Sequence, residues 1–84
     1  MMKIYLFIEM VRKADARDIA KRLKKLKLDK AKFANVVVLA DDKIVAQLDC
    51  DDAAAGQKAI LEKIAVIEGV VQTNVIAAVT PVKR

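Results

Sequence analysis

Apolar residues recur at every second position in some segments of this chain and at every third or fourth position in others. The change from the first spacing to the second and back occurs twice. Residues 3–11 alternate apolar with mixed side chains and are rich in β-branched and aromatic types, which predicts a strand. Residues 14–27 place apolar side chains three and four positions apart, which predicts a helix that runs to about residue 28. Asp15 stands where the N-cap of that helix belongs.

A hairpin is expected after a polar connection over residues 29–34. Residues 35–40 predict a second strand, and the alternating pattern of residues 43–50 predicts a third. Between them, Asp41 and Asp42 predict a tight turn.

The last third of the chain repeats the change of period. Residues 51–69 begin at an aspartate cap and carry a helical stripe, and Gly69 is expected to end this helix because glycine readily takes the left-handed conformation. Gly56, in the first turn, costs about 1 kcal/mol of helix stability relative to alanine. A last strand is predicted over residues 70–80, and Pro81 is expected to end it because proline has no N–H to donate.

These elements follow the order β-α-β-β-α-β, which two right-handed split crossovers join into one sheet. The predicted fold class is α+β, a ferredoxin-like βαββαβ plait in which a four-stranded antiparallel sheet carries two helices on one face. We expect a single such domain over residues 1–84. Two copies packed sheet to sheet would form an assembly of the dimeric α+β barrel type.

Two helices cover only one face of such a sheet, so each strand has a helix-facing set and an outward-facing set of residues. In the last strand we expect the odd-numbered residues 71–79 to face the helices and the even-numbered residues 70–78 to face outward. The outward surface then mixes apolar bodies with polar heads, as a partly wet interface does. The residues expected to build a dimer interface are Tyr5, Phe7, Val45, Gln72, Asn74 and Ile76. The alternative, a solvated face with scattered apolar residues, stays open.

Composition supports association. Hydrophobic residues make up 56% of the chain, but Tyr5, Phe7 and Phe33 are its only aromatic residues. The core must therefore consist of Val, Ile, Leu and Ala, and the apolar content exceeds what one small monomer usually needs. We expect a homodimer or a higher homo-oligomer to bury this excess apolar surface between its subunits.

Cysteine and histidine usage gives catalysis little support and provides no Cys/His zinc pattern. Cys50 is the only cysteine and there is no histidine, so the chain has no internal disulfide and no Cys/His zinc site. We expect Cys50 to be a structural thiol and the protein to be non-enzymatic, with no cofactor and no metal. The first apolar stretch is too short for a membrane span and contains Glu9, so a cytoplasmic location without membrane contact is expected.

The net charge of +5 is unevenly spread along the chain. Residues 1–33 hold eleven Lys/Arg against four Asp/Glu, whereas the rest of the chain holds five against seven. One alternative function is therefore nucleic-acid binding through the basic first helix, where Arg17, Lys21, Lys24 and Lys25 lie along one side. Most such runs are solvated helix faces, so direct nucleic-acid binding is not the leading expectation.

The stretch VIEGVVQTNVIAAV, residues 66–79, resembles the closing segment of the ligand-sensing (RAM) domain of the Lrp/AsnC family of transcriptional regulators. The similarity continues in order through IYLFIEM and DDKIVAQLDCDD. It implies a stand-alone amino-acid-sensing and oligomerisation module, with Asp42 and Thr73 at the ligand and backbone groups near Gly69 beside them. The family's hairpin turn usually carries Gly-x-Tyr-Asp; here LADDK keeps the aspartate but neither the glycine nor the tyrosine.

The chain is also similar to the small maturation chaperone of periplasmic nitrate reductase, the NapD type, which shares the element order and a comparable EGV helix exit. This second resemblance implies a sheet that holds an arginine-bearing signal peptide. Glu9 and Asp49 suit such a peptide, whereas the net charge of +5 does not, so this function ranks second.

Overall fold

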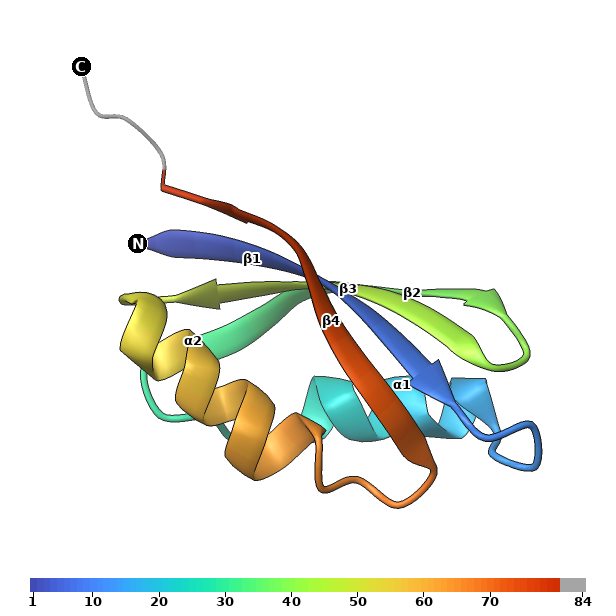
Figure 1. Ribbon diagram of the computed structural model, residues 1–84. Helices are drawn as coiled ribbons and strands as arrows, with labels where there is room; N and C mark the ends of the chain where they lie inside the picture. Colours follow the sequence, from blue (N-terminus) through green and yellow to red (C-terminus); the bar gives the residue numbers. More distant parts are fainter. Residues whose placement is uncertain (81–84) are drawn as a thin grey trace.

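The architecture is a sheet covered on one side only (Figure 1). The computed structural model describes residues 1–80, so Pro81 lies outside the described residues. The elements are, in chain order, β1 (Met2–Met10), α1 (Ala16–Lys25), β2 (Ala31–Ala40), β3 (Lys43–Cys50), α2 (Ala53–Ala59), the π-helical turn η1 (Ile60–Ile64) and β4 (Val70–Val79). The strands form one antiparallel sheet in the order β2-β3-β1-β4, with both helices beneath it. The predicted ferredoxin-like plait is confirmed.

The two central strands, β1 and β3, pair without a register shift from Met2 opposite Cys50 to Glu9 opposite Lys43. Strict alternation sends every second side chain of both strands toward the helices. The buried residues on these strands are Ile4, Leu6, Ile8, Met10, Ile44, Ala46, Leu48 and Cys50. The helical layer meets them with Ala16, Ile19, Ala20, Leu23, Ala59 and Ile64. Burial of each large aliphatic side chain stabilises the fold by about 1.5–3 kcal/mol.

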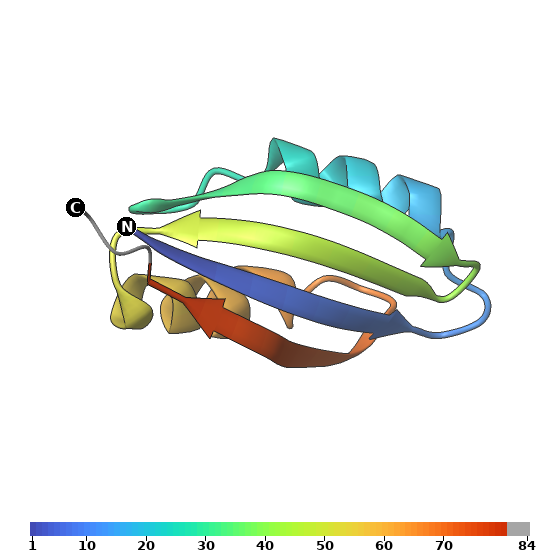
Figure 2. The ribbon, with the colours of Figure 1, turned by 90° about the horizontal axis from the view of Figure 1, so that it is seen from above.

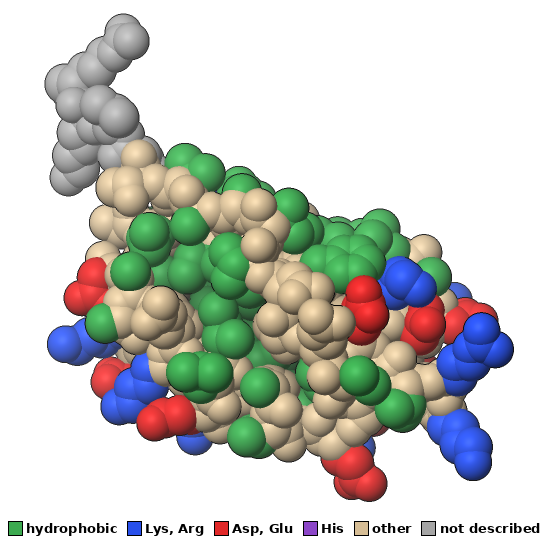
Figure 3. All heavy atoms as spheres, viewed as in Figure 1, with side chains coloured by type: hydrophobic (Ala, Val, Ile, Leu, Met, Phe, Trp, Pro, Cys, Tyr) green, Lys and Arg blue, Asp and Glu red, His purple; other side chains and the backbone are tan. Residues whose placement is uncertain are grey.

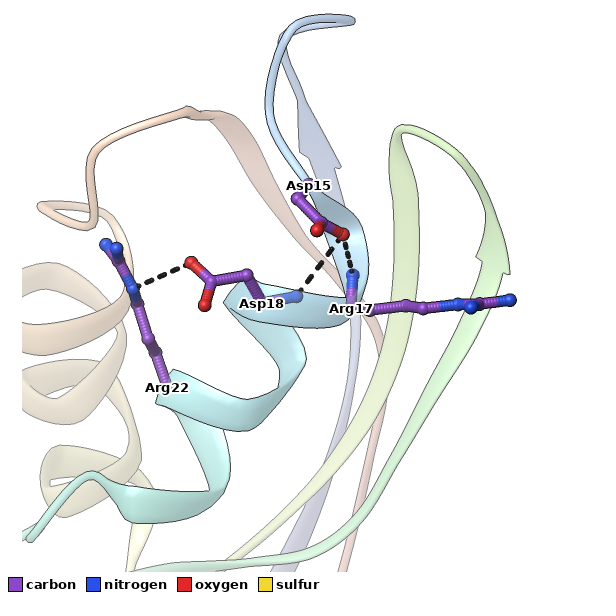
Figure 4. A network of polar contacts seen from close by, with 4 residues as sticks. All are labelled: Asp15, Arg17, Asp18 and Arg22. Carbon is purple, nitrogen blue, oxygen red and sulfur yellow. Dashed lines mark hydrogen bonds and ion pairs between the residues drawn. The ribbon is translucent and has the colours of Figure 1, made fainter.

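α1 begins at the predicted aspartate cap (Figure 4). The Asp15 carboxylate accepts hydrogen bonds from the backbone N–H of Arg17 at 3.0 Å and of Asp18 at 3.4 Å. One turn later, Nε of Arg22 lies 3.1 Å from Oδ2 of Asp18. The two hydrogen bonds to Asp15 satisfy backbone donors that the first turn of a helix leaves unpaired, whereas the Asp18–Arg22 contact is a surface ion pair between side chains one turn apart.

α1 ends at Lys25, earlier than predicted, and β2 begins earlier than predicted. Leu26 has extended backbone angles, and Lys30 turns the chain with a φ of 57° in the left-handed region. Of the residues 29–34 expected to form a polar connection, residues 31–34 are instead part of β2, which pairs with the far end of β3, where Ala31 stands opposite Cys50. Strand pairing outweighs local composition here.

The second helical segment is less regular than the single helix predicted. Its N-cap is Asp52, whose carboxylate accepts the N–H of Ala55 at 2.8 Å. After α2 the helix widens into η1, where the N–H of Ala65 donates to the carbonyl of Ile60 at 2.8 Å. Gly69 has a φ of +95°, as expected of a residue that reverses the chain after a helix.

β4 does not keep the alternation predicted for it. Its register opposite β1 shifts twice, and Val71 and Ile76 stand opposite no β1 residue. Each of these bulges moves the following side chains to the other face of the sheet. The predicted face is therefore right for residues 72–75 only. The residues whose predicted face was wrong are Val70, Ala77, Ala78 and Val79.

β4 is also only partly covered on its helix side. Val75 faces the helices, opposite the buried Leu6, yet it is 54% exposed. The space-filling view shows hydrophobic side chains gathered over β4 and between it and α2 (Figure 3). β4 is therefore an apolar sheet edge that the helical layer leaves open.

At Gly56, α2 approaches the sheet closely. A Cβ built on it would overlap Cδ1 of Ile4 and would lie 3.1 Å from Sγ of Cys50. The helix stability lost at this glycine is thus offset by the close packing that it permits.

We expect Gly56→Ala to lower the free energy of unfolding by about 1–3 kcal/mol, because overpacking outweighs a helix-propensity gain of about 1 kcal/mol. Urea denaturation measures the change. Ile4→Val removes the Cδ1 atom, so Gly56→Ala should be much less harmful in that background. An equal loss in both backgrounds would contradict the packing explanation.

Candidate functional site

The side of the sheet opposite the helices, here called the open face, is free of helices along all four strands (Figure 2). Its central residues are Lys3, Tyr5, Phe7 and Glu9 of β1 and Lys43, Val45, Gln47 and Asp49 of β3. The edge strands add neighbours on either side through their cross-strand pairing. The open face is thus the largest surface that the fold leaves without a covering layer.

The centre of the open face is apolar. Phe7 stands opposite Val45, and Val45 stands opposite Val37 of β2. Tyr5 lies two residues before Phe7 on β1, so its side chain is on the same face. Tyr5, Phe7 and Val45 are half-buried by their neighbours, and Val37 is 45% exposed. These side chains leave aromatic and aliphatic surface in contact with water.

Four charges of the two central strands surround this centre, and we call them the corner charges; Lys32 of β2 adds a cation beside Asp49. Lys3 stands opposite Asp49 at one end of the central pair, and Glu9 stands opposite Lys43 at the other. Gln47 donates from Nε2 to Oδ1 of Asp49 at 3.0 Å, which fixes that carboxylate on the face. The sign of the charge therefore alternates around the apolar centre, both along each strand and between the strands.

Five of the six predicted interface residues share the open face: Tyr5, Phe7, Val45, Gln72 and Asn74. The amide of Gln72 donates to Oδ1 of Asn74 at 3.2 Å, and both side chains are exposed. Ile76 lies in the second bulge of β4 and is 58% exposed. The role of all six residues in an interface stays a prediction.

Sequence reasoning did not single out Val37, Lys3 or Lys43 for this face. Val37 belongs to the uninterrupted apolar run VVVL, which carries no alternation to reveal its face. The two lysines could have been found, since they alternate with buried residues in strands of regular pattern. Cross-strand pairing is what makes them members of one charge pattern.

The three predicted ligand residues lie toward one end of the sheet. The carbonyls of Asp42 and Gly69 accept hydrogen bonds, both at 2.9 Å, from consecutive N–H groups where β1 ends. Thr73 stands opposite Ile8, on the helix side of the sheet, where Oγ1 is buried and has no hydrogen-bond partner among residues 1–80. The structure thus places two of the residues around the end of β1 and the third on β4, with its side chain on the helix side of the sheet.

These residues do not line a common hollow. Asp42 borders a hollow of about 440 Å³ with Arg12 and Lys43, and its carboxylate lies 3.1 Å from Nζ of Lys43. Gly69 packs tightly, because a Cβ built there would lie 3.0 Å from Cβ of Ala14. Neither Gly69 nor Thr73 borders that hollow. Their role in ligand binding stays a prediction.

Cys50 is buried in the core, at 2% exposure, and its Sγ donates to the carbonyl of Met2 at 3.6 Å. Burial raises the pKa of the thiol, and the nearby carboxylates of Asp52, Asp49 and Asp51 raise it further. A thiol with a raised pKa is a poor nucleophile. Within the described part of the chain, no three Cys, Asp or Glu side chains gather closely enough to hold a metal ion.

None of the helices in residues 1–80 combines the length and the apolar character needed to cross a membrane. Comparison of the chain with protein-family models, with curated proteins and with solved structures finds no match.

We expect native Cys50 to react with iodoacetamide at pH 8 at least ten times more slowly than in the urea-unfolded chain, because burial and the raised pKa both suppress the thiolate. Mass spectrometry follows the alkylation. Because the pKa of Cys50 is raised in the folded state, the thiol ionises more readily in the unfolded chain. The free energy of unfolding should therefore fall as the pH rises above about 8.5, the usual pKa of a free thiol. Cys50→Ala should therefore lose less stability between pH 8 and 10. Equal alkylation rates in the two states would contradict this account.

Proposed function

We propose that the protein is a non-enzymatic assembly module that pairs with a second copy of itself through the open face. The observation that supports this most is the apolar centre ringed by the four corner charges. Protein interfaces combine an apolar, well-packed core with a polar rim that stays partly hydrated. A second copy would remove the aromatic and aliphatic surface of Tyr5, Phe7, Val45 and Val37 from water.

The corner charges favour a second copy over an unrelated partner, because their pattern is complementary to itself. Face-to-face pairing of two identical sheets requires a two-fold axis that lies in the plane of the interface. With the axis along the strands, β1 lies over the partner's β3, so that Lys3 meets Asp49 and Glu9 meets Lys43. With the axis across the strands, β1 lies over the partner's β1, so that Lys3 meets Glu9 and Asp49 meets Lys43. Unlike charges meet in both arrangements, which guides orientation more than it adds affinity.

We expect the solution mass to be twice that of the 9.3 kDa chain at high concentration and to fall on dilution. Val45→Glu places like charges near the two-fold axis in an apolar setting, so it should raise the Kd at least tenfold, about 1.4 kcal/mol. Leu61→Glu is the matched control, since Leu61 lies on η1 and is 69% exposed. Sedimentation across a dilution series measures all three proteins. A single chain at millimolar concentration would overturn the proposal.

A charge exchange identifies the axis. The double variant Glu9→Lys with Lys43→Glu keeps the net charge and keeps opposite charges at these paired positions. With the axis along the strands, every contact between copies still joins unlike charges, so the Kd should stay near that of the native chain. With the axis across the strands, the new lysine meets Lys3 and the new glutamate meets Asp49, so the Kd should rise at least tenfold. If Glu9→Lys alone and Lys43→Glu alone both leave the Kd unchanged, the corner charges do not lie in the interface.

Amino-acid sensing, which the resemblance to the Lrp/AsnC family implies, is the second candidate function. The observation that favours it is the buried hydroxyl of Thr73, since a buried polar group without a partner is unfavourable and rare. Thr73 is also one of the positions that match the family motif, together with Asp42 and Gly69. A small amino acid that reached this end of the sheet would supply polar groups for such a hydroxyl.

We expect one of the twenty amino acids to raise the Tm of the pure protein, because a ligand at 100 times its Kd stabilises the folded state by about 2.7 kcal/mol. Asp42→Ala and Thr73→Val should each remove the shift, whereas the neighbouring control Asp41→Ala should retain it. Differential scanning fluorimetry measures the shift. No shift with any amino acid would exclude sensing while leaving the pairing proposal intact. Binding of a twin-arginine peptide by a monomer would favour the NapD-type chaperone function instead.

A further inference from the structure

α1 and its flanks carry a dense positive charge that the proposed pairing does not use. Residues 12–32 contain ten Lys/Arg and three Asp, so more than half of the cations of the chain lie in a quarter of its length. All ten of these cationic residues are exposed. Most of the segment lies in the helical layer, on the side of the sheet away from the open face. Lys32 is the exception, because it lies on β2 opposite Asp49 of the open face.

Two of the three acidic groups in this segment are already engaged. Asp15 accepts two backbone hydrogen bonds as the N-cap, and Asp18 pairs with Arg22 (Figure 4). Among residues 1–80, the Arg22 contact is the only ion pair that involves a cation of this segment. The other nine cations therefore face solvent without a carboxylate within ion-pair distance in the described chain.

Four of these cations are regularly spaced along one side of α1. Arg17, Lys21 and Lys24 are spaced four and three residues apart, with Lys25 beside them, and they extend over about 10 Å at 1.5 Å per residue. The opposite side of α1 packs into the core through Ile19 and Leu23. We call Arg17, Lys21, Lys24 and Lys25 the basic stripe.

The chemistry around the basic stripe restricts its partner. A membrane-surface helix needs a free apolar face, but the apolar side of α1 is buried in the fold. A protein interface needs aromatic or aliphatic anchors, and the exposed side of α1 has only charged side chains. A polyanion with regularly spaced charges needs neither of these features.

We propose that the basic stripe binds the phosphate backbone of nucleic acid without reading its sequence. The four cations contact successive phosphates and release the counterions condensed on them. Pairing through the open face leaves the stripe accessible on the far side of each copy, so the site does not depend on that pairing.

Fluorescence anisotropy with a labelled 20-base-pair DNA of arbitrary sequence, and with its single strand, tests the proposal. Four phosphate contacts predict a slope of log K against log salt of about −3.6 on duplex, at about −0.9 per contact. Lys21→Glu with Lys24→Glu should reduce this slope by about 1.8 and weaken binding at 50 mM salt at least tenfold. Circular dichroism shows whether the reversed charges disturb folding. If they do, Lys21→Gln with Lys24→Gln removes the same two phosphate contacts and should reduce the slope by about the same amount.

The matched control is Lys58→Glu with Lys63→Glu, which changes net charge equally on α2 and η1, where both lysines are exposed. This control should keep the native slope. If both double variants lose DNA affinity equally, the basic stripe is not the binding site. Val45→Glu should keep the slope as well, which separates a failure of this proposal from a failure of open-face pairing. Competition by polyglutamate as effective as by DNA would reassign the stripe to acidic proteins. Absence of binding to either probe at 50 mM salt would refute the proposal.

Discussion

The uninterrupted pairing of β1 with β3 is the constraint on which both faces of the molecule depend. Because side chains alternate along a strand, this one register sends Ile, Leu and Ala toward the helices and all four corner charges to the open face. A slip of one residue would move Lys3 and Glu9 into the core and bring Ile4 and Leu6 into water. The register is therefore specified twice, by burial on one side and by charge on the other.

The fold was predictable wherever a local pattern and the tertiary structure agree. β1 and β3 alternate cleanly, Asp15 caps α1 through its own carboxylate, and Gly69 takes the left-handed conformation after a helix. The start of β2 was not predictable, because Lys32 and its neighbours become strand only through pairing with β3. The π-helical turn η1 likewise has no signal in an apolar sequence that fits an α-helix equally well.

The same distinction applies to the candidate site. Tyr5, Phe7 and Val45 could be assigned to the open face because they lie on the two regular strands. The residues of β4 could not all be assigned, since its two bulges arise from the match between β4 and β1 rather than from β4 alone. The predicted ligand residues came from a resemblance alone. Whether Thr73 and Gly69 could reach a ligand depends on packing, such as that of Gly69 against Ala14, which the sequence does not encode locally.

The irregular edges of the sheet support the proposal that copies pair through a face rather than through an edge. β4 has no charged residue and no proline along its length, and β2 has only Lys32, so composition alone would leave both strands open to pairing with other chains. Each edge strand instead carries two register shifts, whereas the central pair carries none. Bulges bend an edge and interrupt its ladder of unpaired N–H and C=O groups, so an added strand could match it only in short pieces. Apolar surface can then be buried between copies most effectively where the sheet is regular, which is over β1 and β3.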